Sequence, residues 1–193
     1  LKEKAPADEQ LRSRLVQARV FELKGYQDRA LRVYKAIATA PIDSVAAPAV
    51  LRATQIRLQL GQIDAAQAAG IFDGLRYRWR GDSTELETIR ALGQLYLAQG
   101  RYREALEALR SAGVRLPDLP QAQQLQADLG AAFRALFLDG LADGLEPLQA
   151  LALFFDFKEL APIGADGDLM VRKIVRRLVD VDLLPQAAEL LKY

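Results

Sequence analysis

A glycine followed five positions later by an alanine recurs in this sequence of 193 residues at three places between helix-like segments. The second glycine lies 36 residues after the first (61 minus 25), and the third lies 39 residues after the second (100 minus 61). A period of this length is typical of folds in which one small unit stacks on copies of itself. The sequence therefore predicts a repeat array, and the three phrases are Gly25/Ala30, Gly61/Ala66 and Gly100/Ala105.

The segments around these phrases have the periodicity of helices. Apolar residues recur at steps of three and four, for example at Leu11, Leu15, Ala18 and Phe21, which places them on one helix face. Ala, Leu, Arg, Gln and Glu dominate, and all of them favour helices. Runs of Val, Ile and Thr with strand-like alternation are nearly absent. We therefore expect an all-α fold of helices about 10–18 residues long, separated by Gly, Pro and Asp.

The clearest repeat covers residues 86–119. Gly93 and Ala105 are small enough for two helix backbones to approach each other, and Gly100 can adopt the positive φ angle that ends a helix. Tyr96 and Leu109 are placed to fill the space around that contact. With Leu92, Tyr102, Ala112 and Pro117, this pattern resembles the tetratricopeptide repeat (TPR) consensus, a helix–turn–helix unit of about 34 residues.

The resemblance implies an α-solenoid of stacked TPR-like helix–turn–helix hairpins in a right-handed superhelical array. It covers residues 11–119 and fades beyond 120, where an irregular insertion near 140–168 contains a helix from about Pro147 to Leu160. Asp182 and Ala187 place a further turn phrase near the end. We expect one solenoid domain, 1–193, that is part of a longer chain, with units at 11–42, 47–80, 86–119, 123–160 (irregular) and 168–193 (truncated).

The amino-acid composition excludes most kinds of catalytic and metal-binding site. The chain has no Cys and no His, so thiolate catalysis, histidine bases and the common zinc ligands are excluded. The acidic pairs Asp139/Asp143 and Asp166/Asp168 are better explained by turns and helix caps than by a cation site. A net charge of +1 disfavours nucleic acid, and no apolar run is long enough for membrane insertion. We predict a non-enzyme with no cofactor and no metal.

The resemblance instead implies a scaffold for protein–protein interaction. TPR arrays bind a peptide or helix of a partner in the concave groove formed by their first helices. Arg-rich positions in that groove suit a partner with apolar anchors and some acidic residues. The alternative is that these residues form ordinary solvated helix faces. In the register of the family, the expected groove residues are Arg12, Arg19, Leu51, Gln55, Leu58, Glu87, Arg90, Gln94, Arg172 and Arg176.

Two aromatic segments have competing interpretations. The first carries three guanidiniums and two aromatic rings, which are enriched in protein interfaces and can also stack on bases. The favoured interpretation is that an aromatic ring fills the space between repeats and the arginines stabilise a helix end. This first segment consists of Arg76, Tyr77, Arg78, Trp79 and Arg80. The second contains Phe154, Phe155 and Phe157, for which packing in the core is favoured over an exposed contact surface.

A second function remains open from the sequence. The repeats can instead act as a structural, self-assembling spacer of a larger protein, which would make the chain a homo-oligomer. The chain is rich in Arg and Ala and lacks Asn, a bias that favours a bacterial source. Without Asn, the paired-Asn clamp that some TPR proteins use for chaperone tails is not reproduced. The sequence does not indicate whether the protein is located in the cytoplasm or in the periplasm.

Overall fold

The computed structural model describes residues 7–113 and 117–192. They form ten α-helices and one short 3-10 helix, without a strand in either described range. The elements are α1 (Ala7–Leu23), α2 (Gln27–Ala38), α3 (Asp43–Gln59), α4 (Ala65–Arg78), α5 (Ser83–Ala98), α6 (Tyr102–Gly113), α7 (Pro120–Phe137), α8 (Pro147–Asp156), η1 (Lys158–Leu160), α9 (Ala165–Asp180) and α10 (Leu184–Leu190).

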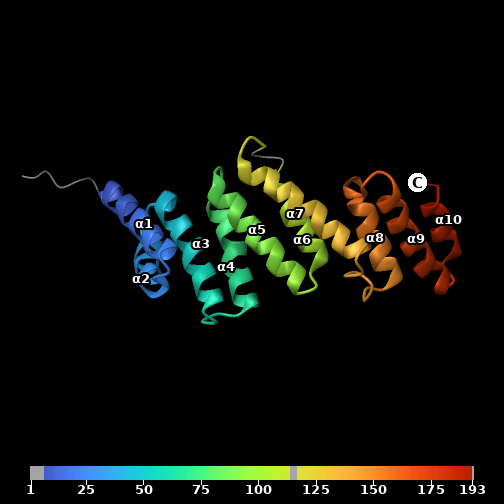
Figure 1. Ribbon diagram of the computed structural model, residues 1–193, viewed down its shortest axis with the longest axis horizontal. Helices are drawn as coiled ribbons and strands as arrows, with labels where there is room; N and C mark the ends of the chain where they lie inside the picture. The colour runs from blue at the N-terminus through green and yellow to red at the C-terminus, as the bar shows by residue number, and fades with distance from the viewer. Residues whose placement is uncertain (1–6, 114–116, 193) are drawn as a thin grey trace, which may run out of the picture.

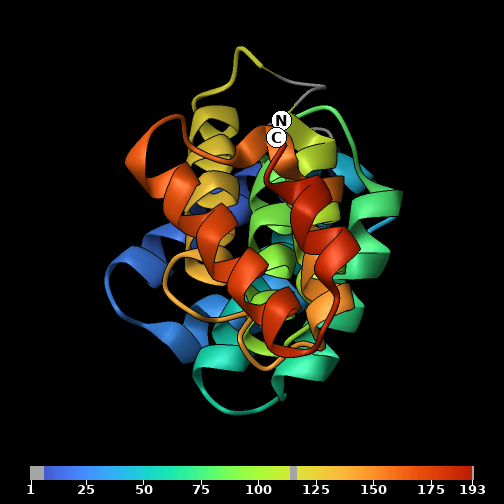
Figure 2. The same cartoon turned by 90° about the vertical axis from the view of Figure 1, so that its right-hand side faces the viewer.

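Hairpins stack along one axis, and they are formed by the helix pairs α1–α2, α3–α4, α5–α6 and α9–α10, with α7 and α8 between the last two. Figure 1 shows the array as an elongated row from α1 to α10, and Figure 2 views it along that row. The first helices of successive hairpins also touch one another, so that α1, α3, α5, α7 and α9 form one continuous layer. The expected all-α solenoid of TPR-like hairpins is therefore confirmed.

The hairpin turns share one backbone motif. Gly25, Gly61 and Gly100 have φ angles of 79°, 66° and 72°, and Asp182 has φ 60° at the corresponding place in the last hairpin. After each of these residues the next amide donates a hydrogen bond to a carbonyl five residues earlier, as from Arg101 to Tyr96 at 2.9 Å. This bond defines the Schellman motif, which satisfies carbonyls at a helix end. The repeated glycine therefore marks a left-handed turn residue.

Replacing one of these glycines should weaken the fold measurably. Because a side chain at φ 72° is strained, Gly100→Ala should lower the free energy of unfolding by about 1–2 kcal/mol. Asp182→Gly is the matched control and should leave stability unchanged or raise it, because glycine relieves the same strain. Urea unfolding followed by circular dichroism measures both. Equal, small changes in the two variants would contradict a left-handed requirement.

Small residues bring the two helices of a hairpin together. A Cβ atom built on Gly93 in α5 would lie 2.7 Å from Cγ of Leu109 in α6, so no side chain fits there without displacement. Ala105, which the sequence assigned to the same contact, is completely buried. The predicted close approach of these helices is confirmed, and Leu109 packs directly on the glycine.

The last hairpins repeat the middle of the array at a constant shift of 82 positions (165 minus 83). This shift relates the starts of α9 and α5, the left-handed residues Asp182 and Gly100, and the starts of α8 and α4. The same shift relates buried residues to one another, for example Phe154 to Phe72. Within the irregular region expected near 140–168, α8 and η1 therefore take the place of α4.

The phenylalanine cluster lies in the core. Phe154 and Phe157 are fully buried, and Phe155 is half-buried at the edge. The ring of Phe154 lies 5.6 Å from that of Phe133 and 5.3 Å from that of Phe137, both on α7. Core packing, the favoured interpretation of this segment, is therefore confirmed. Aromatic packing joins α8 to α7 across the connection of residues 138–146.

Candidate functional site

Two adjoining cavities open on the layer of first helices. One, of about 350 Å³, lies among α1, α3 and α5, and the other, of about 370 Å³, lies among α3, α5 and α7. Four residues line both of them: Arg52, Gln55, Ala91 and Gln94. The first has a mixed lining in which Ile56, Leu58, Phe72 and Leu95 stand beside polar and charged side chains, whereas the second is lined mainly by polar side chains. We refer to the two cavities together as the groove.

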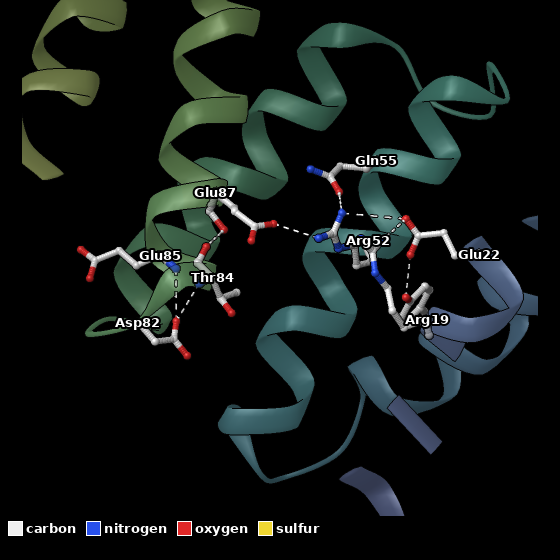
Figure 3. A network of polar contacts seen from close by, with 10 residues as sticks. Arg19, Glu22, Arg52, Gln55, Asp82, Thr84, Glu85 and Glu87 are labelled. Carbon is white, nitrogen blue, oxygen red and sulfur yellow. Dashed lines mark hydrogen bonds and ion pairs between the residues drawn. The ribbon is translucent and has the colours of Figure 1, made fainter. Parts of the chain in front are cut away.

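Arg52 lies at the centre of the groove and links three helices. Its guanidinium is 3.0 Å from a carboxylate oxygen of Glu87 on α5 and 3.8 Å from one of Glu22 on α1. It also donates a hydrogen bond to the Gln55 side-chain oxygen at 3.3 Å. Arg19 pairs with the same oxygen of Glu22 at 2.7 Å. Figure 3 shows these side chains converging from α1, α3 and α5.

Further ion pairs continue along the first helices. Arg90 on α5 pairs with Asp128 on α7, and Gln124 donates a further hydrogen bond to Asp128 at 2.9 Å. Arg134 on α7 pairs with Asp166 on α9 at 2.7 Å. Successive repeats are therefore joined by polar bridges as well as by the core. In the groove and at its edge, Arg19, Arg52 and Arg90 are each paired with a carboxylate of the same chain.

A buried tyrosine holds the side chain of Glu22 in place by a hydrogen bond. The hydroxyl of Tyr34 on α2 donates a hydrogen bond of 2.7 Å to Glu22, and the Tyr34 side chain is only 1% exposed. Burial, followed by the hydrogen bond to the Glu22 carboxylate, raises the pKa of Tyr34 well above its ordinary value near 10. The hydrogen bond from Tyr34 leaves Glu22 oriented toward Arg19 and Arg52.

This raised pKa predicts a loss of stability in alkali. The folded state holds the Tyr34 proton more tightly than the unfolded state, so its contribution is present below pH 10 and falls as the pH rises above that value. We expect the melting temperature of the natural chain to fall more between pH 9 and pH 11 than that of Tyr34→Phe. The measurement is thermal unfolding at both pH values. An identical fall in both proteins would contradict the assignment to Tyr34.

Most of the residues that the sequence places in the groove are found along it or at its edge. The others lie elsewhere. Gln55, Leu58, Glu87, Arg90 and Gln94 line the cavities, and Arg19 contacts Glu22 at their edge. Leu51 does not belong to this surface. It is 2% exposed and packs in the core with residues of α3 and α4, so the expectation that it contacts a partner is wrong.

The other three expected residues lie elsewhere. Arg12 is exposed on α1 outside both cavities, and Arg176 is exposed on α9. Arg172 lines a different cavity, between η1, α9 and α10. The expected set also lacks Arg52 and Asp128, which take part in the bridges between neighbouring helices. Arg52 lies one turn before Gln55 on the same helix, and this spacing is a signal that could have found it.

The arginine-rich segment at the end of α4 divides into two parts. Trp79 is half-buried, packs on the core and donates a hydrogen bond to Asp82 at 2.9 Å, while Arg78 pairs with Asp43 at 2.6 Å. Arg76 pairs with Asp73 at 2.6 Å and lies over the ring of Tyr77, which is 63% exposed. Arg80, beyond the end of the helix, has its guanidinium 5.9 Å from the centre of the same ring. Trp79 therefore contributes to the core, whereas Arg78 and Tyr77 are exposed and stay predicted contacts.

Comparison with known proteins agrees with this geometry. Residues 86–129 match the model of the tetratricopeptide repeat family. This part of the chain is similar to a tetratricopeptide repeat. The match spans α5, α6 and the first half of α7, so the Arg90–Asp128 bridge lies within the TPR segment. No curated protein matches the sequence.

Solved structures show the TPR-like fold over nearly the whole chain. TPR-like repeats of a Podosopora anserina protein described as a kinesin light chain superpose with a TM-score of 0.51 at 17% identity, covering 95% of this chain and 92% of that chain. A variant of those repeats gives a TM-score of 0.53 at 16% identity, covering 98% and 94%. At this identity the likeness concerns the fold.

TPR repeats generally mediate protein–protein interaction, and the fold is typically a non-catalytic scaffold. Among the residues that the structure describes, no cluster of acidic residues could hold a metal ion. None of the described helices is both long enough and apolar enough to cross a membrane.

Proposed function

We propose that this chain is a non-catalytic scaffold that binds a peptide or helix of a partner protein in the groove. The supporting observation is the pair of adjoining cavities that share Arg52, Gln55, Ala91 and Gln94. The apolar residues of the first cavity provide anchor sites, and the amide side chains of the second can donate and accept hydrogen bonds. A partner segment lying across α1, α3, α5 and α7 would contact both.

The charges of the groove define which partner fits. Because Arg19, Arg52 and Arg90 are paired with Glu22, Glu87 and Asp128, the groove has no excess positive charge. Recruiting these guanidiniums to an acidic ligand would break existing bridges. We therefore propose a largely neutral partner segment with apolar anchors, in place of the acidic one that the arginines alone indicate. Its affinity should depend little on salt concentration.

A bulky substitution at the junction of the two cavities tests the proposal. Gln94 is exposed and lines both cavities, so Gln94→Trp should block the groove without breaking a bridge. Gln99→Trp, at the exposed end of the same helix and outside both cavities, is the matched control. The measurement is affinity capture from the source cell with the longest natural form of the protein, followed by mass spectrometry.

A defined partner that the natural protein and Gln99→Trp retain, and that Gln94→Trp loses at unchanged helicity, is the expected result. Equal recovery with both tryptophan variants would refute binding in the groove. A structural, self-assembling spacer is the second candidate function, since Val16 and Leu23 near one end and Leu184 and Leu191 near the other are exposed. Recovery of the protein alone from every bait, with a mass in light scattering that rises with concentration, would favour that candidate.

A further inference from the structure

One side of α2 carries a row of three cations. Arg29, Arg32 and Lys35 follow one another at steps of three residues, and all three are exposed. In the part of the chain that the structure describes, none of them forms an ion pair or a side-chain hydrogen bond. Each arginine of α4 and α6, by contrast, is paired with a carboxylate. Those paired arginines are Arg76, Arg78, Arg103 and Arg110.

The exposure of this row does not depend on its place in the first hairpin. Helix α6 begins 75 positions after α2 (102 minus 27), so that Glu104 and Glu107 take the places of Arg29 and Arg32. Both glutamates are also exposed, although the α5–α6 hairpin has neighbours on either side, since α4 packs on α5 and α7 packs on α6. This side of the second helix therefore faces outward within the array as well.

A cavity of about 390 Å³ adjoins the row, where the turn of the first hairpin meets the end of α3. Arg29 and Arg32 line it together with Tyr26 and Leu60, which are 52% and 44% exposed. The guanidinium of Arg29 lies 5.4 Å from the centre of the Tyr26 ring, so a cation–π contact holds it beside the cavity. Asp28 contributes one carboxylate to the lining, against two guanidiniums.

We propose that this surface, consisting of the row and the adjoining cavity, binds an acidic, extended segment of a partner protein. We call it the α2 surface. The first hairpin (residues 7–38) holds seven Lys or Arg and four Asp or Glu, a net charge of +3 (7 minus 4), whereas the whole chain has +1. Negative segments are therefore attracted to this hairpin more than to the rest of the array.

The spacing of the cations favours an extended segment. Residues three apart on a helix have Cβ atoms about 5–6 Å apart. Alternate side chains of an extended peptide are about 6.6–6.8 Å apart and point to the same side. Three alternating acidic residues would therefore each meet one cation of the row. An apolar residue at the next alternate position, beyond Arg29, would enter the cavity against Tyr26 and Leu60.

Nucleic acid and a second copy of the chain fit the α2 surface less well. A nucleic acid carries a phosphate at every nucleotide, so one would approach Asp28, whereas a peptide can place a neutral residue there. In a second copy, the exposed acids at the equivalent places of α6 already have partners. Glu104 is paired with Arg101 at 3.1 Å, and Glu107 with Arg103 at 4.0 Å.

A short fluorescein-labelled peptide tests the proposal. It carries glutamate at three alternate positions and leucine at the next one, with glycines between them, and fluorescence anisotropy measures its binding to the natural protein. We expect saturable binding that weakens as the salt concentration rises. Arg32→Glu, in the middle of the row, should weaken binding about fivefold to tenfold at unchanged helicity. A peptide with lysine in place of the middle glutamate should restore it on this variant.

The matched control is Arg14→Glu, which changes the net charge equally at an exposed position of α1 outside the cavity lining. It should leave binding nearly unchanged. Absence of saturable binding to the natural protein would overturn the proposal, as would equal weakening by Arg32→Glu and Arg14→Glu or a failure of the lysine peptide to restore binding. Equal affinity for a peptide with glycine in place of leucine would contradict the role of the cavity.

Two further measurements test the other occupants. A single-stranded DNA oligonucleotide that binds more tightly than the peptide and loses affinity in Arg32→Glu would assign the α2 surface to nucleic acid instead. Concentration-dependent dimerisation that Arg32→Glu abolishes, without peptide binding, would assign it to a second copy. The α2 surface is separate from the groove, and the inference does not depend on the proposed function. The result of Gln94→Trp therefore has no bearing on these readouts.

Discussion

Phe154→Ala should lower the free energy of unfolding by about 3–5 kcal/mol, because it removes a fully buried ring and leaves a cavity. The ring contacts Phe133, Phe137 and Phe155, with centroids 5.6, 5.3 and 6.3 Å away. These contacts are the aromatic link between α7 and α8, which a connection of nine residues separates in sequence (138–146). Loss of the ring therefore affects the joint between hairpins as well as one helix.

Equilibrium unfolding in urea, followed by far-ultraviolet circular dichroism, measures this change. Phe155→Ala is the control, because its ring is only half-buried and should cost much less. Because repeat arrays can unfold in parts, a second transition confined to the last hairpins would agree with the expected local role. A change below about 1 kcal/mol for Phe154→Ala would show that the cluster relaxes around the missing ring.

Gly93→Val should destabilise the chain by about 2–3 kcal/mol, because it forces atoms into an occupied space. A Cβ at this position would lie 2.7 Å and 2.8 Å from Cγ and Cδ2 of Leu109. Leu109 is buried and has little room to move away. The α5–α6 hairpin would have to open, and with it the contact that α7 makes on the same hairpin.

The glycine one repeat later provides the comparison. Gly130 occupies the equivalent place in the sequence pattern, but no atom lies within 4 Å of a Cβ built there. Gly130→Ala should therefore raise stability by up to about 1 kcal/mol through the helix preference of alanine. Thermal unfolding of both variants measures these changes in stability, which should be a decrease for Gly93→Val and an increase for Gly130→Ala. Destabilisation by both substitutions would mean that helix packing is equally tight in both hairpins.

The sequence by itself determined the fold class and much of the turn chemistry. Turn geometry is local, so the glycines repeated at intervals of 36 and 39 residues between helix-like segments already indicated where the chain reverses, and Asp182 stands at the equivalent place before Ala187. The sequence pattern also predicted the close packing of α5 on α6, because the small residues Gly93 and Ala105 fall on the facing sides of these two helices. The absence of Cys and His excludes thiol and imidazole chemistry whatever the fold.

Only the tertiary structure decided which side chains the groove exposes and which ones they pair with. Leu51 has the same residue type as Leu58, yet it is buried because its position on α3 faces α4 and the core. Glu22, Arg52 and Glu87 come from three helices, so their bridge depends on how hairpins stack. The Arg52–Glu87 and Arg90–Asp128 pairs join residues 35 and 38 positions apart. Because no local pattern links positions so distant, the neutrality of the groove follows from the stacking of repeats alone.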